Sequence, residues 1–527
     1  MAETADDKQT ATGRIGQAYA FEGPAVELGA VVLDGTVDSA AHVRIPFGML
    51  SRHGLVAGAT GGGKTKTLQL IAEQLSDAGV PVFLTDIKGD LSGVAAPGAS
   101  SEKLTARATQ TGAEGWTPAG FPAQFFAIGG KGNGVPLRAT VTSFGPTLLS
   151  KVLELNDTQE SSLELIFHYA DKAGLALLDL KDLQAVVAHL VSDEGKGDLE
   201  GIGGLSKQTA GVIQRELTGL ADGGGDVLFG EPQFDTADLL QLADGKGVLN
   251  VVELAELSDK PQLFSTFLMW LLADLHHHLP EVGDVDKPKL VFFLDESHLL
   301  FNGASKAFLT SVTQTVRLIR SKGVGVFFCT QNPTDLPGEV LGQLGNRVQH
   351  ALRAFTPDDA TALAKAVKTY PKSQDYDVEQ ALTSLGIGEA IVTVMGETGA
   401  PTPVAWTKLR PPRSLMAQLD PAEQTRQIDA SPLKAKYGQT LDRESAYELL
   451  TKRQADAEDH AETEATKSQP KPSQPKAAPK RQHKEEEAGG MLGGVLKSKA
   501  FQQFTRTAAR SVGREITRGL FGTARRR

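Results

Sequence analysis

Short apolar runs and helical apolar patterns alternate along much of the chain. The short runs are bounded by glycine or charged residues, as in strands covered on both faces, and they occur at 54–58, 80–86, 247–254, 289–296 and 323–331. Apolar residues recur at helical spacing at 64–79, 261–279 and 304–321. Strands that alternate with helices predict an α/β fold with a doubly wound, mostly parallel sheet.

Residues 146–222 interrupt this alternation. The segments LELIFHYADKAG and DLQAVVAHLVSD carry apolar residues at i, i+3 and i+4, which predicts helices without intervening strands. We therefore expect a helical subdomain inserted into the sheet domain. Two later runs, RVQHALRAF and EAIVTVM, are expected to add strands at an edge of the sheet.

The domain organisation follows from these patterns and from local composition. Residues 1–20 are polar, and 455–490 mix Lys, Glu, Gln, Pro and Ala in proportions that cannot bury a core. The expected parts are 1–20, a disordered N-terminus; 21–50, a lead-in of short strands; 51–145, the first half of the core; 146–245, the helical insertion; 246–412, the second half of the core; 413–454, a helical extension; 455–490, a disordered linker; and 491–527, a basic amphipathic helix.

Composition narrows the class of protein. Apolar residues make up 40% and charged residues 22% of the 527 residues, which are globular values, and a single cysteine excludes a disulfide framework. The polar N-terminus does not resemble a secretory signal, and the longest apolar stretches fall short of the ~20 residues that span a bilayer. A cytoplasmic protein without a transmembrane segment is the expectation.

The octet GATGGGKT, residues 58–65, carries the strongest chemical signal. It matches G-x-x-x-x-G-K-[ST], and an apolar strand precedes it while a helix follows it. In such a phosphate-binding loop the backbone N–H groups face the phosphates, Lys64 reaches the β and γ oxygens, and Thr65 ligates Mg²⁺. The expected nucleotide-binding residues are Gly58, Ala59, Thr60, Gly61, Gly62, Gly63, Lys64, Thr65 and Lys66.

An acidic pair ends the apolar run KLVFFLDE. Asp295 is expected to hold Mg²⁺ and Glu296 to activate the attacking water, because two acids at the end of a buried strand are costly without a cation. An alternative is that the pair caps the following helix. Gln331 follows a neighbouring strand and is placed to sense the terminal phosphate, and Asp86 and Lys88 are candidates for supporting roles behind the site.

Two groups of arginines are further candidates. Arg320 and Arg347 are favoured over Arg317 and Arg353 as residues that reach the nucleotide of an adjacent subunit. In the tail, which has two lysines and seven arginines but one glutamate from 497 onward, four arginines are spaced by four and share one helix face. These tail residues could contact DNA, an anionic membrane surface or a neighbouring subunit, and they are Arg506, Arg510, Arg514 and Arg518.

Two short segments imitate the motifs of small GTPases. DIKGD contains D-x-x-G and QNPTD contains N-x-x-D, but the guanine-reading motif requires a lysine after its asparagine, where this chain has Pro333. ATP is therefore the expected nucleotide.

The segments HGLVAGATGGGKT, LVFFLDESHLL and VGVFFCTQNPTDLP resemble the HerA/FtsK superfamily of P-loop ATPases. The stretch from PLRATVTSFGPTLL to LLDLKDL is similar to a bacterial branch of helicase HerA-like proteins of unassigned function. The resemblance covers roughly 45–415 and implies a RecA-like core of the ASCE class. It also implies a homo-oligomer, typically a hexameric ring, with ATP sites that an arginine of the adjacent subunit completes.

The resemblance implies action on double-stranded DNA, as a helicase or translocase, with a nuclease as a possible partner. Three features depart from it: too few residues precede the phosphate loop for the N-terminal barrel of HerA, no FtsK-type membrane segments or winged helix are evident, and the body is acidic. Two hypotheses remain open: an Mg-ATP-driven motor on DNA, and an ATP-gated assembly protein that controls a protein or membrane partner through its basic tail.

Overall fold

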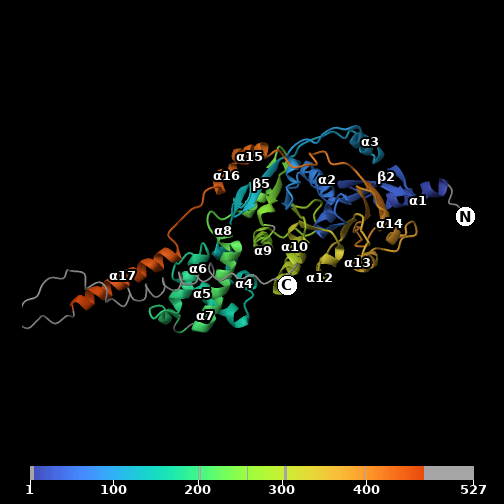
Figure 1. Cartoon of the computed structure of the whole chain (residues 1–527). Helices are drawn as coiled ribbons and strands as arrows, with labels where there is room; N and C mark the ends of the chain where they lie inside the picture. Colours follow the sequence, from blue (N-terminus) through green and yellow to red (C-terminus); the bar gives the residue numbers. More distant parts are fainter. Residues whose placement is uncertain are drawn as a thin grey trace, which may run out of the picture. The chain divides into compact units, whose positions relative to one another are not determined.

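A sheet of 12 strands forms the centre of the computed structural model (Figure 1). Eight neighbouring strands, from β12 to β6, are parallel, and four antiparallel strands extend the sheet beyond β12. In spatial order the strands are β2 (Thr36–Pro46), β1 (Ala25–Leu33), β14 (Ala405–Leu409), β13 (Glu389–Thr393), β12 (Asn346–Gln349), β3 (Gly54–Ala57), β11 (Val324–Thr330), β10 (Leu290–Leu294), β4 (Val82–Asp86), β9 (Leu249–Glu253), β5 (Ala123–Ile128) and β6 (Val135–Leu137). The predicted fold class, an α/β fold with a mostly parallel sheet, is confirmed.

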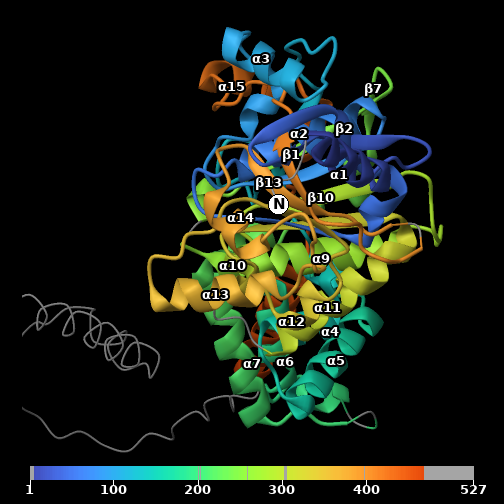
Figure 2. The same cartoon turned by 90° about the vertical axis from the view of Figure 1, so that its right-hand side faces the viewer.

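The central strands are buried on both faces, as their continuous apolar sequences predict. Every residue of β3, β4, β10 and β11 is buried. Helix α2 (Lys64–Asp77) lies on one face of the sheet, whereas α9 (Pro261–His278), α10 (His298–Phe301) and α11 (Lys306–Ile319) lie on the other (Figures 1 and 2). Parallel strands with helices on both faces place every strand's carboxyl end at one edge of the sheet, where ligands of such folds bind.

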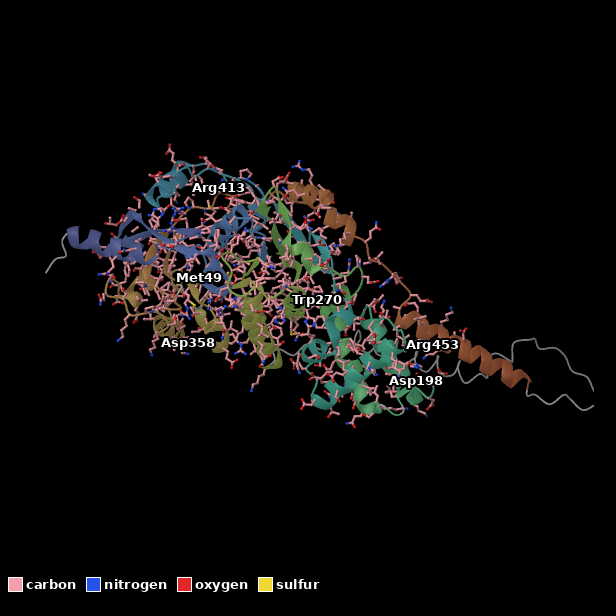
Figure 3. All side chains as sticks on the ribbon, turned by 180° about the vertical axis from the view of Figure 1, so that it is seen from behind. Met49, Asp198, Trp270, Asp358, Arg413 and Arg453 are labelled. Atoms are coloured by element: carbon pink, nitrogen blue, oxygen red, sulfur yellow. The ribbon has the colours of Figure 1, made fainter. Side chains whose placement is uncertain are left out.

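A group of helices lies beyond α9 and α11, on the side away from the sheet (Figure 2). Its members are α4 (Val141–Val152), α5 (Asp157–Lys172), α6 (Leu180–Leu190) and α7 (Lys207–Leu220). A π-helical turn at Ala221–Gly225 and the short α8 (Asp226–Leu228) lead from α7 back to the sheet, where Leu228 O accepts from the Ala139 N–H, just after β6, at 3.0 Å. Side-chain caps begin α4 to α7; for example, Asp179 accepts hydrogen bonds from the first-turn N–H groups of α6. Trp270 of α9 is buried between this group and the sheet (Figure 3).

The remaining elements surround the sheet. They are α3 (Glu102–Gln110), the hairpin β7 (Leu242–Ala243) and β8 (Lys246–Gly247), α12 (Gly338–Leu341), α13 (Pro357–Val367), α14 (Val378–Ser384), α15 (Pro421–Ala430) and α16 (Pro432–Tyr437). Helices α15 and α16 pack on β5 and β6. Arg413 stands at the start of this C-terminal extension, near α2 (Figure 3), and its N–H donates to the buried Glu73 carboxylate of α2.

The expectation of disorder over residues 1–20 is wrong for 5–18, which form helix α1 (Ala5–Ala18). The segment is polar overall, but Ile15 and, just after the helix, Tyr19 are fully buried. The Tyr19 hydroxyl also donates to the carbonyls of Val392 and Pro403, 2.9 and 2.7 Å away. Two buried side chains on the sheet therefore order a segment whose average composition is polar.

The C-terminal helix α17 (Ala446–Lys467) runs into the segment 455–490 that was expected to be a disordered linker. Residues 455–467 are helical, and seven of these thirteen residues are Ala or Glu, which favour helix. The chain divides into two units, 1–459 and 460–527. The structure describes residues 5–199, 201, 203–257, 259–301, 306–396 and 398–467. The predicted tail helix, with Arg506, Arg510, Arg514 and Arg518, lies outside them.

Two further observations concern the sheet and the helices. Strand β12 is not an edge strand as expected but lies between β3 and β13, because β13 pairs with its other side, and β14, β1 and β2 continue the sheet beyond β13. Among the helices that the structure describes, none is both long and apolar enough to cross a bilayer.

Candidate active site

The glycine-rich octet forms a tight loop between β3 and α2. Gly58, Gly61 and Gly63 have φ values of +147°, +82° and +112°, which residues other than glycine rarely adopt. A Cβ on Gly58 would also lie 2.5 Å from the Cβ of His350. Backbone hydrogen bonds hold the loop at both ends: Ala59 N donates to Ala351 O at 2.8 Å, and Gly62 O accepts from Gly388 N at 3.1 Å.

Lys64 and Thr65 begin helix α2. No side chain caps this helix, whose N-cap residue is Gly63, so its first N–H groups face the loop as an anion site requires. The Nζ atom of Lys64 is buried and donates to Gly58 O at 2.6 Å. Burial holds the pKa of Lys64 below its ordinary value, although the negative charges of Glu296 and Asp295 oppose this effect.

Asp295 and Glu296 follow β10 and are both buried. β11 separates β10 from β3, so the acids and the phosphate loop share the carboxyl edge of the sheet. The backbone N–H of Asp295 donates to Thr85 Oγ1 at 2.7 Å, but its Oδ2, like Glu296 Oε2, has no hydrogen-bond partner among the described residues. Burial, and then the charge of Glu296, raise the pKa of Asp295 to about 7.

Lys88 holds the other oxygen of the Glu296 carboxylate in an ion pair. Burial would raise the pKa of Glu296, but the hydrogen bond and charge of Lys88, and then His298 and Lys64, keep it below its ordinary value. Glu296 has φ +46°, an uncommon conformation for a residue with a side chain. Strain at a buried, ion-paired carboxylate is typical of functional sites.

Asp86 supports the loop that carries Lys88. Its carboxylate accepts hydrogen bonds from the N–H groups of Gly89, Leu91 and Ser92 at 2.7, 2.9 and 3.2 Å, and burial raises its pKa to about 6. This turn accounts for the D-x-x-G pattern that imitates a GTPase. Lys66 is the third residue of α2. Its Nζ donates to Oε1 of Gln69, one turn further along the same helix, at 2.9 Å.

Gln331 follows β11 and is exposed at the rim of a cavity of about 490 Å³. Ala59 and Thr60 of the phosphate loop line the same cavity, together with His298, Asn332, Asp335, Leu352, Arg353, Phe355 and Asp359. Arg353, which is a weaker candidate than Arg320 and Arg347 from the sequence, donates to Thr60 O at 3.4 Å. The structure thus brings Gln331 and Arg353 to the loop.

Arg320 and Arg347 do not approach the phosphate loop of their own chain. Arg320 lies before β11, at the opposite edge of the sheet, and pairs with Asp284 at 3.3 Å. Arg347 lies on β12 and donates to the carbonyls of Thr369 and Leu341 at 3.2 and 3.4 Å. Neither can contribute within one subunit, so their predicted role across a subunit boundary stays a prediction.

His350 is a residue of the site that the sequence did not indicate. It follows β12 and is fully buried beneath the loop, with Nδ1 3.0 Å from Glu389 O and Nε2 2.8 Å from Thr67 Oγ1 of α2. Burial, with a smaller contribution from the charge of Lys64, lowers its pKa to about 4. Its neighbours in the sequence carry no phosphate-site pattern, so only the fold reveals this contact.

Three comparisons relate the chain to known proteins. A family model described as "Helicase HerA-like C-terminal" matches residues 33–527. The DNA double-strand break repair helicase HerA of Sulfolobus acidocaldarius is 21% identical over 378 residues, which cover 69% of this chain. The alignment spans 66% of that relative's length, slightly less than two thirds.

Solved structures share the fold. The bacterial conjugative coupling protein TrwB, in its unbound form, aligns with a TM-score of 0.51 at 16% identity and covers 78% of this chain and 94% of TrwB. The same values hold for TrwB in complex with the non-hydrolysable ATP analogue ADPNP. The RecA-like P-loop fold is therefore confirmed, and the predicted class, a P-loop ATPase, is the class that the matching family supports.

Proposed function

Because this chain belongs to the helicase HerA-like C-terminal family, we propose that it is an Mg²⁺-dependent ATP hydrolase that acts on DNA as a homo-oligomer. One observation carries the hydrolase: the phosphate loop faces two buried carboxylates, and Oδ2 of Asp295 has no partner among the described residues, whereas Glu296 is paired with Lys88 and lies 3.4 Å from the His298 ring. An unpartnered buried carboxylate oxygen is costly, and a cation with its water shell would satisfy it.

The donor set fits Mg²⁺, since the Thr65 hydroxyl and the Asp295 carboxylate are oxygen ligands. Mg²⁺, when bound, would neutralise charge on the β and γ phosphates. The loop N–H groups and Lys64 bind and orient the phosphates, and Gln331 orients the attacking water. The oxygen of that water forms a bond to the γ phosphorus, and Glu296 takes a proton from the water. The bond between the γ phosphorus and the oxygen that leaves with ADP breaks.

The Lys88 ion pair supports Glu296 as the base. A base must be ionised to accept a proton, and the pKa of Glu296 is lowered while that of Asp295 is raised. Two adjacent carboxyls whose pKa values are moved in opposite directions can serve different roles, because they are ionised to different extents at the same pH.

Glu296→Gln tests the hydrolase. We expect nucleotide binding within about twofold of wild type and turnover lower by about 100-fold or more, because the amide keeps the shape but cannot accept the proton. The exposed Glu339→Gln is the matched control. Normal turnover by Glu296→Gln would contradict the assignment of the base.

Action on DNA is the finer part of the proposal. The relative from Sulfolobus is a DNA double-strand break repair helicase, which supports DNA as the substrate class. A hexameric ring, a nuclease partner and tail contacts through Arg506, Arg510, Arg514 and Arg518 complete the proposal. Arg320 and Arg347 are the arginines proposed to act between subunits, and the side chain of Arg320 is 40% exposed.

ATP turnover with and without duplex DNA, at low salt where phosphate contacts are strongest, tests this part. We expect DNA to stimulate ATP turnover. If the tail supplies the DNA contact, deletion of 491–527 should remove this stimulation. Arg320→Ala should lose turnover, whereas Arg317→Ala, at an exposed neighbouring residue, should not. Turnover that duplex and single strands leave unchanged would contradict the motor and favour the ATP-gated assembly protein.

A further inference from the structure

The loop of residues 386–388, immediately before β13, contacts the phosphate loop directly. Gly388 N donates to Gly62 O at 3.1 Å, and a Cβ on Gly63 would lie 3.4 Å from the Gly388 backbone. Gly388 has φ +71°, and a side chain there would meet the Arg107 guanidinium at 2.6 Å. The two loops are therefore packed backbone to backbone.

Polar side chains hold the 386–388 loop in place. The Arg107 guanidinium donates to the carbonyls of Ile387, Gly388 and Leu409 at 3.3, 2.6 and 2.9 Å. On the other side, Glu389 Oε2 accepts from Gly386 N at 3.1 Å and from Trp406 Nε1 at 3.0 Å. The loop is thus fixed before any ligand binds.

This fixed loop exposes an apolar side chain. Ile387 is 79% exposed, whereas the residues that anchor the loop on either side are half-buried or buried. An isoleucine held in solvent beside a phosphate loop can cover the apolar face of a ligand without first having to be ordered, which lowers the entropic cost of binding.

The strand order indicates which part of a nucleotide lies there. From β13 the order is β12, β3, β11, β10, so Asp295, Glu296 and Gln331 all lie on one side of the phosphate loop and Ile387 on the other. In the proposed ATP site the γ phosphate lies on the side of these acids. The nucleoside end of the same triphosphate must leave the loop on the opposite side, toward β12 and β13.

We propose that Ile387 is a nucleobase contact, which packs on the face of the base of a bound nucleoside triphosphate. This inference rests on the proposed ATP site. Phe355 is more exposed, at 84%, but lines the cavity shared with Gln331, on the γ-phosphate side. A side chain packed on the face of the base contacts the apolar ring and not the hydrogen-bonding groups at its edge. Ile387 therefore favours a nucleoside triphosphate over a bare polyphosphate but does not select adenine over guanine.

The experiment measures the affinity of the full-length protein for ATP, GTP and inorganic tripolyphosphate, with Mg²⁺, by calorimetry. For Ile387→Ala we expect ATP and GTP to bind about tenfold more weakly, which equals about 1.4 kcal/mol, and tripolyphosphate to bind as in wild type. Leu242→Ala, at a residue 57% exposed on the β7–β8 hairpin, is the matched control and is expected to change nothing. Thermal unfolding checks that both variants are folded.

The other outcomes separate two failures. If Ile387→Ala binds ATP as wild type does, or loses ATP and tripolyphosphate affinity in equal measure, the base contact is wrong and the phosphate site stands. If the wild-type protein binds neither ligand, the proposed ATP site itself fails, and this inference fails with it.

Discussion

Acid should destabilise the fold through the buried imidazole of His350. The ring lies under the phosphate loop with Nδ1 facing Glu389 O, so Nδ1 carries its proton and Nε2 faces the Thr67 hydroxyl. Adding a second proton would place a charge in a fully buried position near the cation of Lys64. The imidazole is therefore neutral in the folded protein at neutral pH.

The magnitude follows from the displaced pKa. Burial lowers the pKa of His350 from 6.5 to about 4, so between these values the unfolded chain binds a proton that the folded chain does not. The free energy of unfolding therefore falls as the pH falls through this window. A pKa lowered by this amount reduces the free energy of unfolding by about 3 kcal/mol once the pH is below both pKa values. Between about pH 7 and pH 4.5 the loss is about 2 kcal/mol.

Other groups titrate in the same window, so the wild-type curve alone does not isolate His350. His53 is also fully buried with a pKa near 4 and adds a loss of the same sign. Asp86, with a pKa of about 6, has the opposite effect on stability. Folding raises the pKa of this carboxyl, so the folded protein binds its proton more readily than the unfolded chain and becomes more stable as the pH falls. A difference between wild type and a variant cancels these contributions.

The assay is urea unfolding of wild type and His350→Gln at about pH 7 and about pH 4.5. Glutamine keeps a donor and an acceptor but does not titrate, so the wild type should lose about 2 kcal/mol more than the variant between the two pH values. His53→Gln serves as the parallel case. The same pH-dependent loss in wild type and His350→Gln would refute the claim that the ring is buried and neutral.

Three further predictions concern the loop and its supports. Gly58→Ala should weaken ATP binding by about tenfold or more, measured by calorimetry, because its Cβ would meet His350 at 2.5 Å with φ at +147°. Lys88→Met should lower kcat by about tenfold with ATP affinity retained, because it frees the Glu296 carboxylate from its ion pair; an unchanged kcat contradicts this. Glu73→Ala should cost about 1–3 kcal/mol in urea unfolding, because it strands the Arg413 N–H donor.

The sequence predicted the core elements well because local and long-range signals agree there. The apolar runs at 289–296 and 323–331 correspond to β10 and β11, and the helical patterns at 261–279 and 304–321 to α9 and α11. Strands buried on both faces are apolar at every position, so their pattern survives whatever they pair with. Family membership, expected from the motif segments, is also confirmed.

The N-terminal helix and the interior position of β12 could not be predicted, for a common reason. Helix α1 is ordered by two side chains that bury against the sheet, and β12 becomes internal only because β13, β14 and the N-terminal hairpin pair beyond it. Helix α1 packs on β1 and β2, and β12 pairs with β13, so both facts depend on tertiary partners outside the segment itself, and neither is encoded in the local alternation of apolar and polar residues.

The same limit explains which site residues the sequence indicated. Lys64 and the Asp295–Glu296 pair occur in short motifs because one turn or one strand end places them. His350, Arg353 and Ile387 reach the phosphate loop from segments that follow β12 or precede β13. Their positions depend on the pairing of these strands beside β3, so they carry no motif of their own. The residue proposed to bind the nucleoside therefore comes from the side of β3 on which β12 and the antiparallel strands lie, while Gln331, Asp295 and Glu296, which are proposed for chemistry, follow β11 and β10 on the other side. If this division holds, substitutions beyond β12 should change affinity for the nucleotide more than the rate of the chemical step, and substitutions at β10 and β11 should do the reverse.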